Sequence, residues 1–78
     1  MKVTLKYFGV IAESAGKSEE VLELEQGLSL RELKDQQIKT YQIQDAGSVQ
    51  IAVNQNLNNE VELKEGDEVA FLPPFAGG

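Results

Sequence analysis

Apolar and polar residues alternate in several short segments of the chain, and this two-residue period predicts β-strands that bury one face. The predicted strands span residues 2–8, 20–25, 48–53 and 68–72, with a short edge strand at residues 61–63. In the first strand Val3, Leu5 and Tyr7 share one face and Phe8 lies on the other. In the last strand Leu72 likewise lies on the face opposite the inward residues. Each strand therefore has a core side and an outer side.

One segment has the period of a helix and a clear start signal. Ser29 and Glu32 have the spacing of a capping box, in which each residue's side chain bonds the other's backbone N–H. We expect the main helix to begin at Leu30 and to end between Ile38 and Tyr41. Its apolar stripe is interrupted by Gln37, a polar residue at a position where an apolar one is expected.

The connecting segments complete the fold prediction. Residues 9–17 read as a loop with one helical turn at 10–15, and the glycine in residues 64–67 marks a turn before the last strand. Pro73 and Pro74 then end the sheet, because proline donates no backbone hydrogen bond. The order predicts an α+β fold, a mixed sheet of four to five strands with one main helix across it. The β-grasp arrangement is the simplest such fold, as one domain over residues 1–78 with a flexible C-terminal tail at 74–78.

Composition narrows the possible functions. The chain contains no His and no Cys, so it has no imidazole base, thiolate nucleophile or soft metal ligand. A net charge of −6 argues against nucleic-acid binding, and no apolar run predicts a signal peptide or a membrane span. We expect a cytoplasmic protein that binds no cofactor or metal and is not catalytic alone.

The C-terminal segment carries the strongest functional signal. Pro73 and Pro74 stiffen its root, and Gly77 and Gly78 give a tip without side chains. Residues 74–78 could extend over ~16 Å, so the terminal carboxylate of Gly78 could enter a narrow active site of another protein. The alternative is an ordinary chain terminus that happens to end in two glycines.

Residues 66–78, Gly-Asp-Glu-Val-Ala-Phe-Leu-Pro-Pro-Phe-Ala-Gly-Gly, resemble the C-terminal signature of the small, sulfur-carrier subunit of molybdopterin synthase. Residues 52–55 resemble the end of that family's third strand, and residues 2–8 its first strand. The resemblance covers essentially the whole chain, but only the C-terminal block is highly specific. It implies a ubiquitin-like β-grasp fold.

The resemblance also implies a mechanism and partners. An E1-like adenylating enzyme would use ATP and magnesium to adenylate the Gly78 carboxylate, and a sulfur donor protein would convert the acyl-adenylate to a thiocarboxylate. The large synthase subunit would accept the tail within a heterotetramer and transfer sulfur to cyclic pyranopterin monophosphate. Phe8, Leu57, Leu72 and Phe75 match the positions of the family's hydrophobic partner contact. The alternative is that these four are unrelated apolar residues scattered over the surface, which is normal for single residues.

Two departures and three rival interpretations remain. Ala12 stands where the family often carries arginine, so any partner salt bridge there is in doubt, and residues 34–47 are short and rich in glutamine. The nearest rival is the sulfur carrier of the thiazole pathway in thiamin biosynthesis, which shares the fold and the Gly-Gly end. A ubiquitin-like interaction module without an activated terminus is the second, and an independent enzyme is the last.

Overall fold

The alternation at the N-terminus produces a central strand with one fully buried face. The structure is a computed structural model that describes residues 1–57 and 62–73. Its elements are β1 (Lys2–Tyr7), α1 (Gly9–Ala15), β2 (Glu19–Glu23), α2 (Leu30–Tyr41), a 3₁₀ turn (Ala46–Ser48), β3 (Gln50–Val53) and β4 (Glu68–Leu72). In β1, Val3, Leu5 and Tyr7 are buried, as predicted from the pattern.

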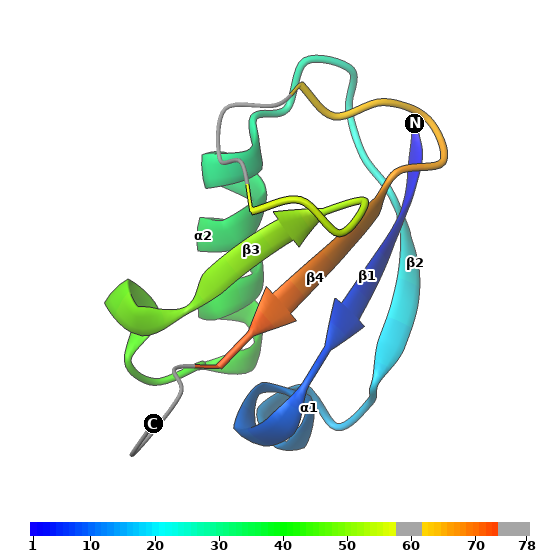
Figure 1. Cartoon of the computed structure of the whole chain (residues 1–78). Coiled ribbons are helices and arrows are strands. Elements are labelled where there is room, and N and C mark those ends of the chain that lie inside the picture. Colours follow the sequence, from blue (N-terminus) through cyan, green and yellow to red (C-terminus); the bar gives the residue numbers. More distant parts are fainter. Residues whose placement is uncertain (58–61, 74–78) are drawn as a thin grey trace.

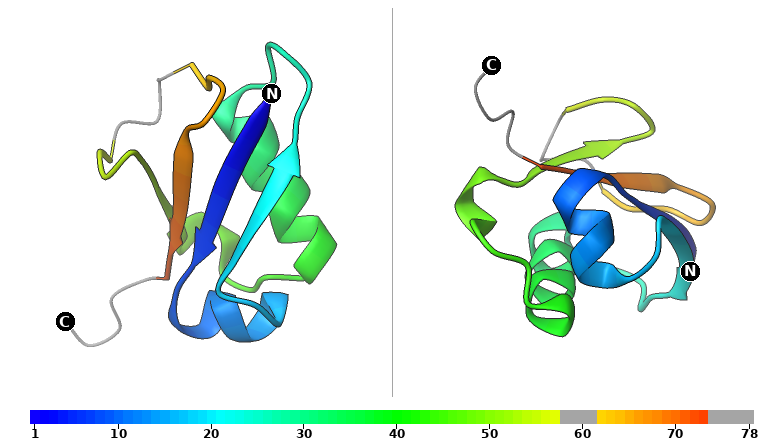
Figure 2. Two further views of the ribbon diagram at one scale, coloured as in Figure 1. Left: turned by 90° about the vertical axis from the view of Figure 1, so that its right-hand side faces the viewer. Right: turned by 90° about the horizontal axis from the view of Figure 1, so that it is seen from below.

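The four strands form one mixed sheet in the order β2-β1-β4-β3 (Figure 1). β1 pairs antiparallel with β2 and parallel with β4, and β3 pairs antiparallel with β4. Because β1 and β4 are parallel, their C-terminal ends lie at the same end of the sheet, where α1 also lies (Figures 1 and 2). α2 crosses one face of the sheet (Figure 2). The predicted α+β fold with a mixed sheet and one main helix is confirmed.

The core lies between the sheet and α2. Its buried residues come from β1, β3, β4, both helices and the connecting segments, and Leu22 of β2 packs against them half-buried. The buried residues are Met1, Val3, Leu5, Tyr7, Ile11, Leu30, Leu33, Ile43, Val49, Ile51, Val53, Leu63, Val69 and Phe71. The opposite face of the sheet has no helix over it in Figure 2. Among the described residues, no helix has the length and apolar character needed to cross a membrane.

The start of α2 is fixed by its capping box. The Glu32 N–H donates to Ser29 Oγ at 3.1 Å, and the Ser29 N–H donates to Glu32 Oε1 at 3.3 Å. The helix ends at Tyr41, because Gln42 has a left-handed backbone (φ 52°) and its N–H closes on the Ile38 carbonyl. Both predicted bounds of α2 are confirmed.

Several element boundaries differ from the prediction. β1 ends at Tyr7 instead of Phe8, and β2 spans Glu19–Glu23 instead of residues 20–25. α1 is a complete short helix of 7 residues, longer than the single turn that we expected. β3 begins at Gln50 because Ser48 belongs to the 3₁₀ turn before it. The predicted edge strand at residues 61–63 is wrong for Glu62 and Leu63, which are not in a strand, and Val61 lies outside the described residues. Leu63 enters the core without strand pairing and is buried.

Candidate functional site

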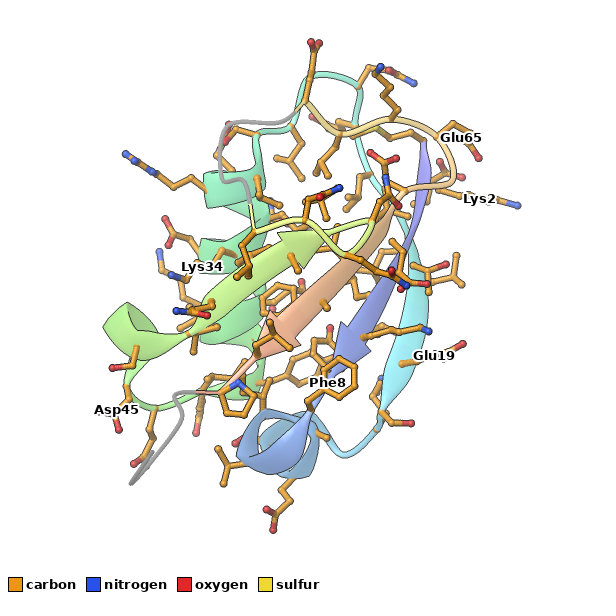
Figure 3. The ribbon with its side chains drawn as sticks, in the orientation of Figure 1. Lys2, Phe8, Glu19, Lys34, Asp45 and Glu65 are labelled. Atoms are coloured by element: carbon orange, nitrogen blue, oxygen red, sulfur yellow. The ribbon has the colours of Figure 1, made fainter. Side chains whose placement is uncertain are left out.

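Two of the four predicted contact residues are exposed, and a third is half-buried. Phe8 follows β1 directly and is 45% exposed, and Leu57, after β3, is 64% exposed. Leu72, the last residue of β4, is half-buried. Figure 3 shows Phe8 near the end of β1, on the face of the sheet opposite α2. Phe75, Gly77 and Gly78 lie outside the described residues.

The structure brings Phe8, Leu57 and Leu72 together around one shallow depression of about 470 Å³. Ala52 of β3 and Ala70 of β4 also line it, and they are cross-strand partners in the sheet. We call these five residues the docking surface. These residues come from three separate parts of the chain. Because alanine side chains are small, Ala52 and Ala70 form the bottom of the depression between the larger apolar side chains.

Charged and amide side chains line the rest of this depression. Lys6 Nζ and Glu68 Oε2 form an ion pair at 3.4 Å, and both side chains are more than one third exposed. Gln50 and Gln55 are also among the lining residues. An apolar centre with polar groups around it is the usual arrangement of a protein–protein contact.

A tight turn after β3 brings Leu57 to the docking surface. Asn54 and Gln55 have φ values of 49° and 72°, and Val53 and Asn56 pair across the turn. The Asn54 side chain donates to Asp67 Oδ1 and accepts from the Glu68 N–H, both at 3.0 Å. Asparagine tolerates the left-handed conformation better than most residues, and these bonds tie the turn to the start of β4.

The root of the C-terminal segment is packed against the start of α1. Gly9 has φ +55°, and a Cβ atom added to it would lie 3.1 Å from Pro73 Cγ. A side chain at this position would therefore press on Pro73. The close approach holds Pro73 beside Phe8, next to the docking surface, at the point where the described chain ends.

A polar cluster around the buried Tyr7 and Gln37, which the sequence did not predict, joins α2 to the sheet. Tyr7 Oη and Tyr41 Oη donate to Glu20 Oε2 at 2.5 and 2.6 Å, and Gln37 Nε2 donates to Tyr7 Oη at 2.9 Å. Lys17 Nζ lies 3.3 Å from Glu20 Oε1. We call these five residues the Glu20 cluster. The signal in the sequence was Gln37, the polar residue that interrupts the helical stripe.

The Glu20 cluster shifts the proton affinities of its members. Burial favours the neutral form of Glu20, but the hydrogen bonds from Tyr41, Tyr7 and Lys17 together outweigh burial and lower its pKa. Burial and the adjacent Glu20 carboxylate raise the pKa of Tyr7. No buried side-chain nitrogen or oxygen atom of the described residues lacks a hydrogen-bond partner. The cluster links α2 to β1 and β2 and shares no residue with the docking surface, so it stabilises the fold.

Few titratable groups among the described residues lie at the docking surface. Residues 1–57 and 62–73 contain no group of three His, Cys, Asp or Glu side chains that could hold a metal ion. Within the part of the chain that the structure describes, the only charged side chains that line the depression around the docking surface are the paired Lys6 and Glu68. Its apolar centre and polar surroundings suit binding of another protein rather than catalysis.

Comparisons with known proteins identify the family of the chain. Residues 5–78 match the ThiS family. Over 82 aligned residues the chain is 38% identical to the molybdopterin synthase sulfur carrier subunit of Mycobacterium tuberculosis, with 100% of this chain and 99% of the relative covered.

Solved structures give the same result. A putative molybdopterin converting factor subunit 1 from Pyrococcus furiosus superposes with a TM-score of 0.79 at 35% identity, over 95% of this chain and 98% of that chain. A complex of subunits 1 and 2 of the molybdopterin-converting factor from Helicobacter pylori contains a chain that is 31% identical, with a TM-score of 0.70 and both chains fully covered (100%). The fold is thus the ubiquitin-like β-grasp that the sequence predicted, and the chain belongs to the ThiS family, with the molybdopterin synthase sulfur carrier subunits among its relatives.

Proposed function

We propose that this protein is the sulfur carrier subunit of a molybdopterin synthase and that the terminal carboxylate of Gly78 is its working group. The observation that carries the proposal is the docking surface beside Pro73, which only three residues separate from Gly77 and Gly78. A surface that binds a partner next to the tail would bring the terminus to the partner's active site. The similarity to sulfur carrier subunits along the whole chain supports this assignment.

The proposed chemistry has two steps. A carboxylate oxygen of Gly78 attacks the α-phosphate of ATP in an E1-like enzyme, and pyrophosphate leaves. Hydrosulfide, delivered by a donor protein, then attacks the acyl carbon, AMP leaves with the electrons of the acyl C–O bond, and loss of the proton on sulfur leaves a thiocarboxylate on Gly78. The large subunit would then use the sulfur of two loaded carriers to build the dithiolene of molybdopterin from cyclic pyranopterin monophosphate, and each Gly78 would return to the carboxylate.

The carrier itself contributes binding and position. Activation needs no base from the carrier because the carboxylate is already ionised at neutral pH. Each large apolar side chain buried in a contact contributes ~1.5–3 kcal/mol, so Phe8, Leu57 and Leu72 would supply much of the affinity for the large subunit. The solved complex of subunits 1 and 2 from Helicobacter pylori supports a partner of that kind. The proposal extends to Phe75 in the contact, to a heterotetramer, and to the cytoplasm, where ATP is available.

The experiment is a reconstituted assay with the adenylating enzyme, ATP, a sulfide source and the large subunit. A chain that lacks Gly78, and a chain extended by two residues beyond it, should each lose sulfur loading and dithiolene formation. The intact mass reports loading directly, as the replacement of one oxygen by sulfur. Gly77→Ala should load more slowly, because the added Cβ atom makes the end of the tail wider and hinders its entry into the partner's active site.

Two measurements make the result specific. The melting temperature should not change in any of these variants, because none of them alters the core. A chain without Gly78 that still forms the dithiolene at the normal rate would refute the carrier mechanism and favour the interaction module. Loading with retention of a thiazole-forming partner, instead of the large subunit, would favour the thiamin-pathway carrier.

A further inference from the structure

A second concave surface lies on the other side of β3, between this strand and α2. The groove has a volume of about 560 Å³. Leu30, Arg31 and Lys34 line it from α2, and Val49 and Ile51 line it from the β3 side. Figure 3 shows Lys34 on α2, beside β3. The groove lies beside the depression that holds the docking surface, and Gln50 and Leu57 line both.

The backbone of β3 presents a hydrogen-bonding edge to this groove. β3 is an edge strand of the sheet, and its only strand neighbour among the described residues is β4. The Asn54 N–H donates to the Glu68 carbonyl. Because alternate residues of a strand point their backbone groups to the same side, Asn54, Ala52 and Gln50 all point theirs at β4. Val53 points the other way, since it exchanges two bonds with Asn56 at 2.8 and 3.0 Å.

By the same alternation, the N–H and C=O of Ile51 point outward, away from β4. Within residues 1–57 and 62–73 these two groups have no backbone partner. A row of outward N–H and C=O groups is a template for pairing with another extended chain. Ile51 is therefore the position at which an added strand would form its bonds.

The side chains set which residues that strand would carry. The Ile51 side chain is 4% exposed and lies on the core side of the sheet. A residue placed opposite Ile51 on an added strand would direct its side chain to the same side. There it would meet Leu30, Val49 and Ile51, so an apolar residue fits this position.

The charges at the groove favour an acidic strand. The chain has a net charge of −6, yet Arg31 and Lys34 stand at this groove with a single carboxylate, Asp35. The ion pairs among the described residues involve other cations, namely the N-terminus, Lys6 and Lys17. Arg31 and Lys34 are therefore available to bind acidic side chains two residues away from the apolar one on the same strand face.

We propose that the groove between α2 and β3 binds an extended segment of a partner protein by strand addition at Ile51. The segment carries an apolar residue that packs on Leu30, Val49 and Ile51, with aspartate or glutamate flanking it on the same face against Arg31 and Lys34. This binding is separate from sulfur transfer and does not use the Gly-Gly end.

The test uses the full chain and a fluorescein-labelled ten-residue peptide. The peptide has valines at the centre of one strand face and aspartates at both ends of that face. Fluorescence anisotropy gives the affinity, and amide chemical shifts in the ¹⁵N-labelled chain give the location. We expect the largest shifts at Ile51 and its neighbours, and binding that weakens as salt is raised.

Matched variants and peptides separate the charge and backbone contributions. The double variant Arg31→Glu and Lys34→Glu should lower affinity about tenfold, since surface ion pairs are modest one by one. Lys39→Glu changes charge on the same helix outside the groove and should have little effect. A peptide with lysine in place of aspartate should bind more weakly. A peptide whose backbone nitrogens are methylated along the edge that faces β3 should not bind.

Three outcomes would overturn the proposal. These are no anisotropy change up to millimolar peptide, shifts confined to the docking surface, or equal losses in the Lys39→Glu and double variants. Concentration-dependent shifts at Ile51 without peptide would assign the groove to a second copy of this chain. None of these results depends on Gly78, so failure here leaves the sulfur carrier proposal untouched.

Discussion

Replacement of Glu20 by alanine tests whether the Glu20 cluster holds α2 on the sheet. The carboxylate accepts hydrogen bonds from Tyr7 of β1 and from Tyr41 at the end of α2, at 2.5 and 2.6 Å. Its side chain is only 15% exposed. In Glu20→Ala, Tyr7 keeps the bond that it accepts from Gln37 but loses the acceptor for its own hydroxyl proton. Tyr7 itself is 2% exposed, so water cannot easily replace that acceptor.

The expected loss of stability is large for a chain of this size. A hydrogen bond to a charged group contributes ~1.5–3 kcal/mol, and a buried donor without a partner costs ~1–3 kcal/mol. Tyr41 is half-buried and can turn to water, so its bond counts for less than that of Tyr7. We expect a loss of about 3 kcal/mol, set mainly by the bond from Tyr7. The whole domain has a stability of only ~4–12 kcal/mol.

Urea denaturation at pH 7 measures this loss. The midpoint of Glu20→Ala should fall with little change in the slope. Glu19→Ala is the matched control, because Glu19 is an exposed neighbour on the same strand, and it should change stability by less than ~0.5 kcal/mol. A loss below ~1 kcal/mol for Glu20→Ala would mean that the cluster contributes no more than one ordinary hydrogen bond, against this reasoning.

The same cluster predicts the direction of a pH effect. The pKa of Glu20 is lower in the folded chain than its ordinary value, so at mildly acidic pH the unfolded chain binds more protons there. The stabilisation is complete above the unfolded pKa of ~4.3 and declines as pH falls through the folded pKa. The stability difference between the parent chain and Glu20→Ala should therefore shrink on acidification from pH 6 to pH 3. A constant difference over this range would refute the ionic part of the interpretation.

The remaining predictions concern the helix cap and the docking surface. Ser29→Ala should cost about 1 kcal/mol of unfolding free energy in urea titration, and no change would mean that the bonds between Ser29 and Glu32 add nothing. Phe8→Ala and Leu72→Ala should each weaken binding to the large subunit, measured by calorimetry, about tenfold or more, with the melting temperature nearly unchanged. Val21→Ala removes a comparably exposed apolar side chain (60%) from β2 and should bind normally. Equal losses in all three variants would contradict the docking surface.

Local features of this fold could be predicted from the sequence because their partners lie a few residues apart. The cap of α2 needs only Ser29 and Glu32, and the turn before β4 needs only a glycine, Gly66, that can adopt φ +86°. The outward direction of Phe8 and Leu72 followed from the period of two in each strand. These properties are written in consecutive residues, so a one-dimensional pattern is sufficient.

The tertiary structure decided what depends on residues far apart in the chain. Gln37 only interrupted an apolar stripe in the sequence, but the structure buries it against Tyr7, 30 positions away, where its amide has a polar partner. Strand order likewise brings Phe8, Leu57 and Leu72 around one depression, and it leaves β3 at the edge of the sheet beside α2. Pattern gives the face on which a side chain lies, but only the pairing of strands determines which distant side chain lies next to it.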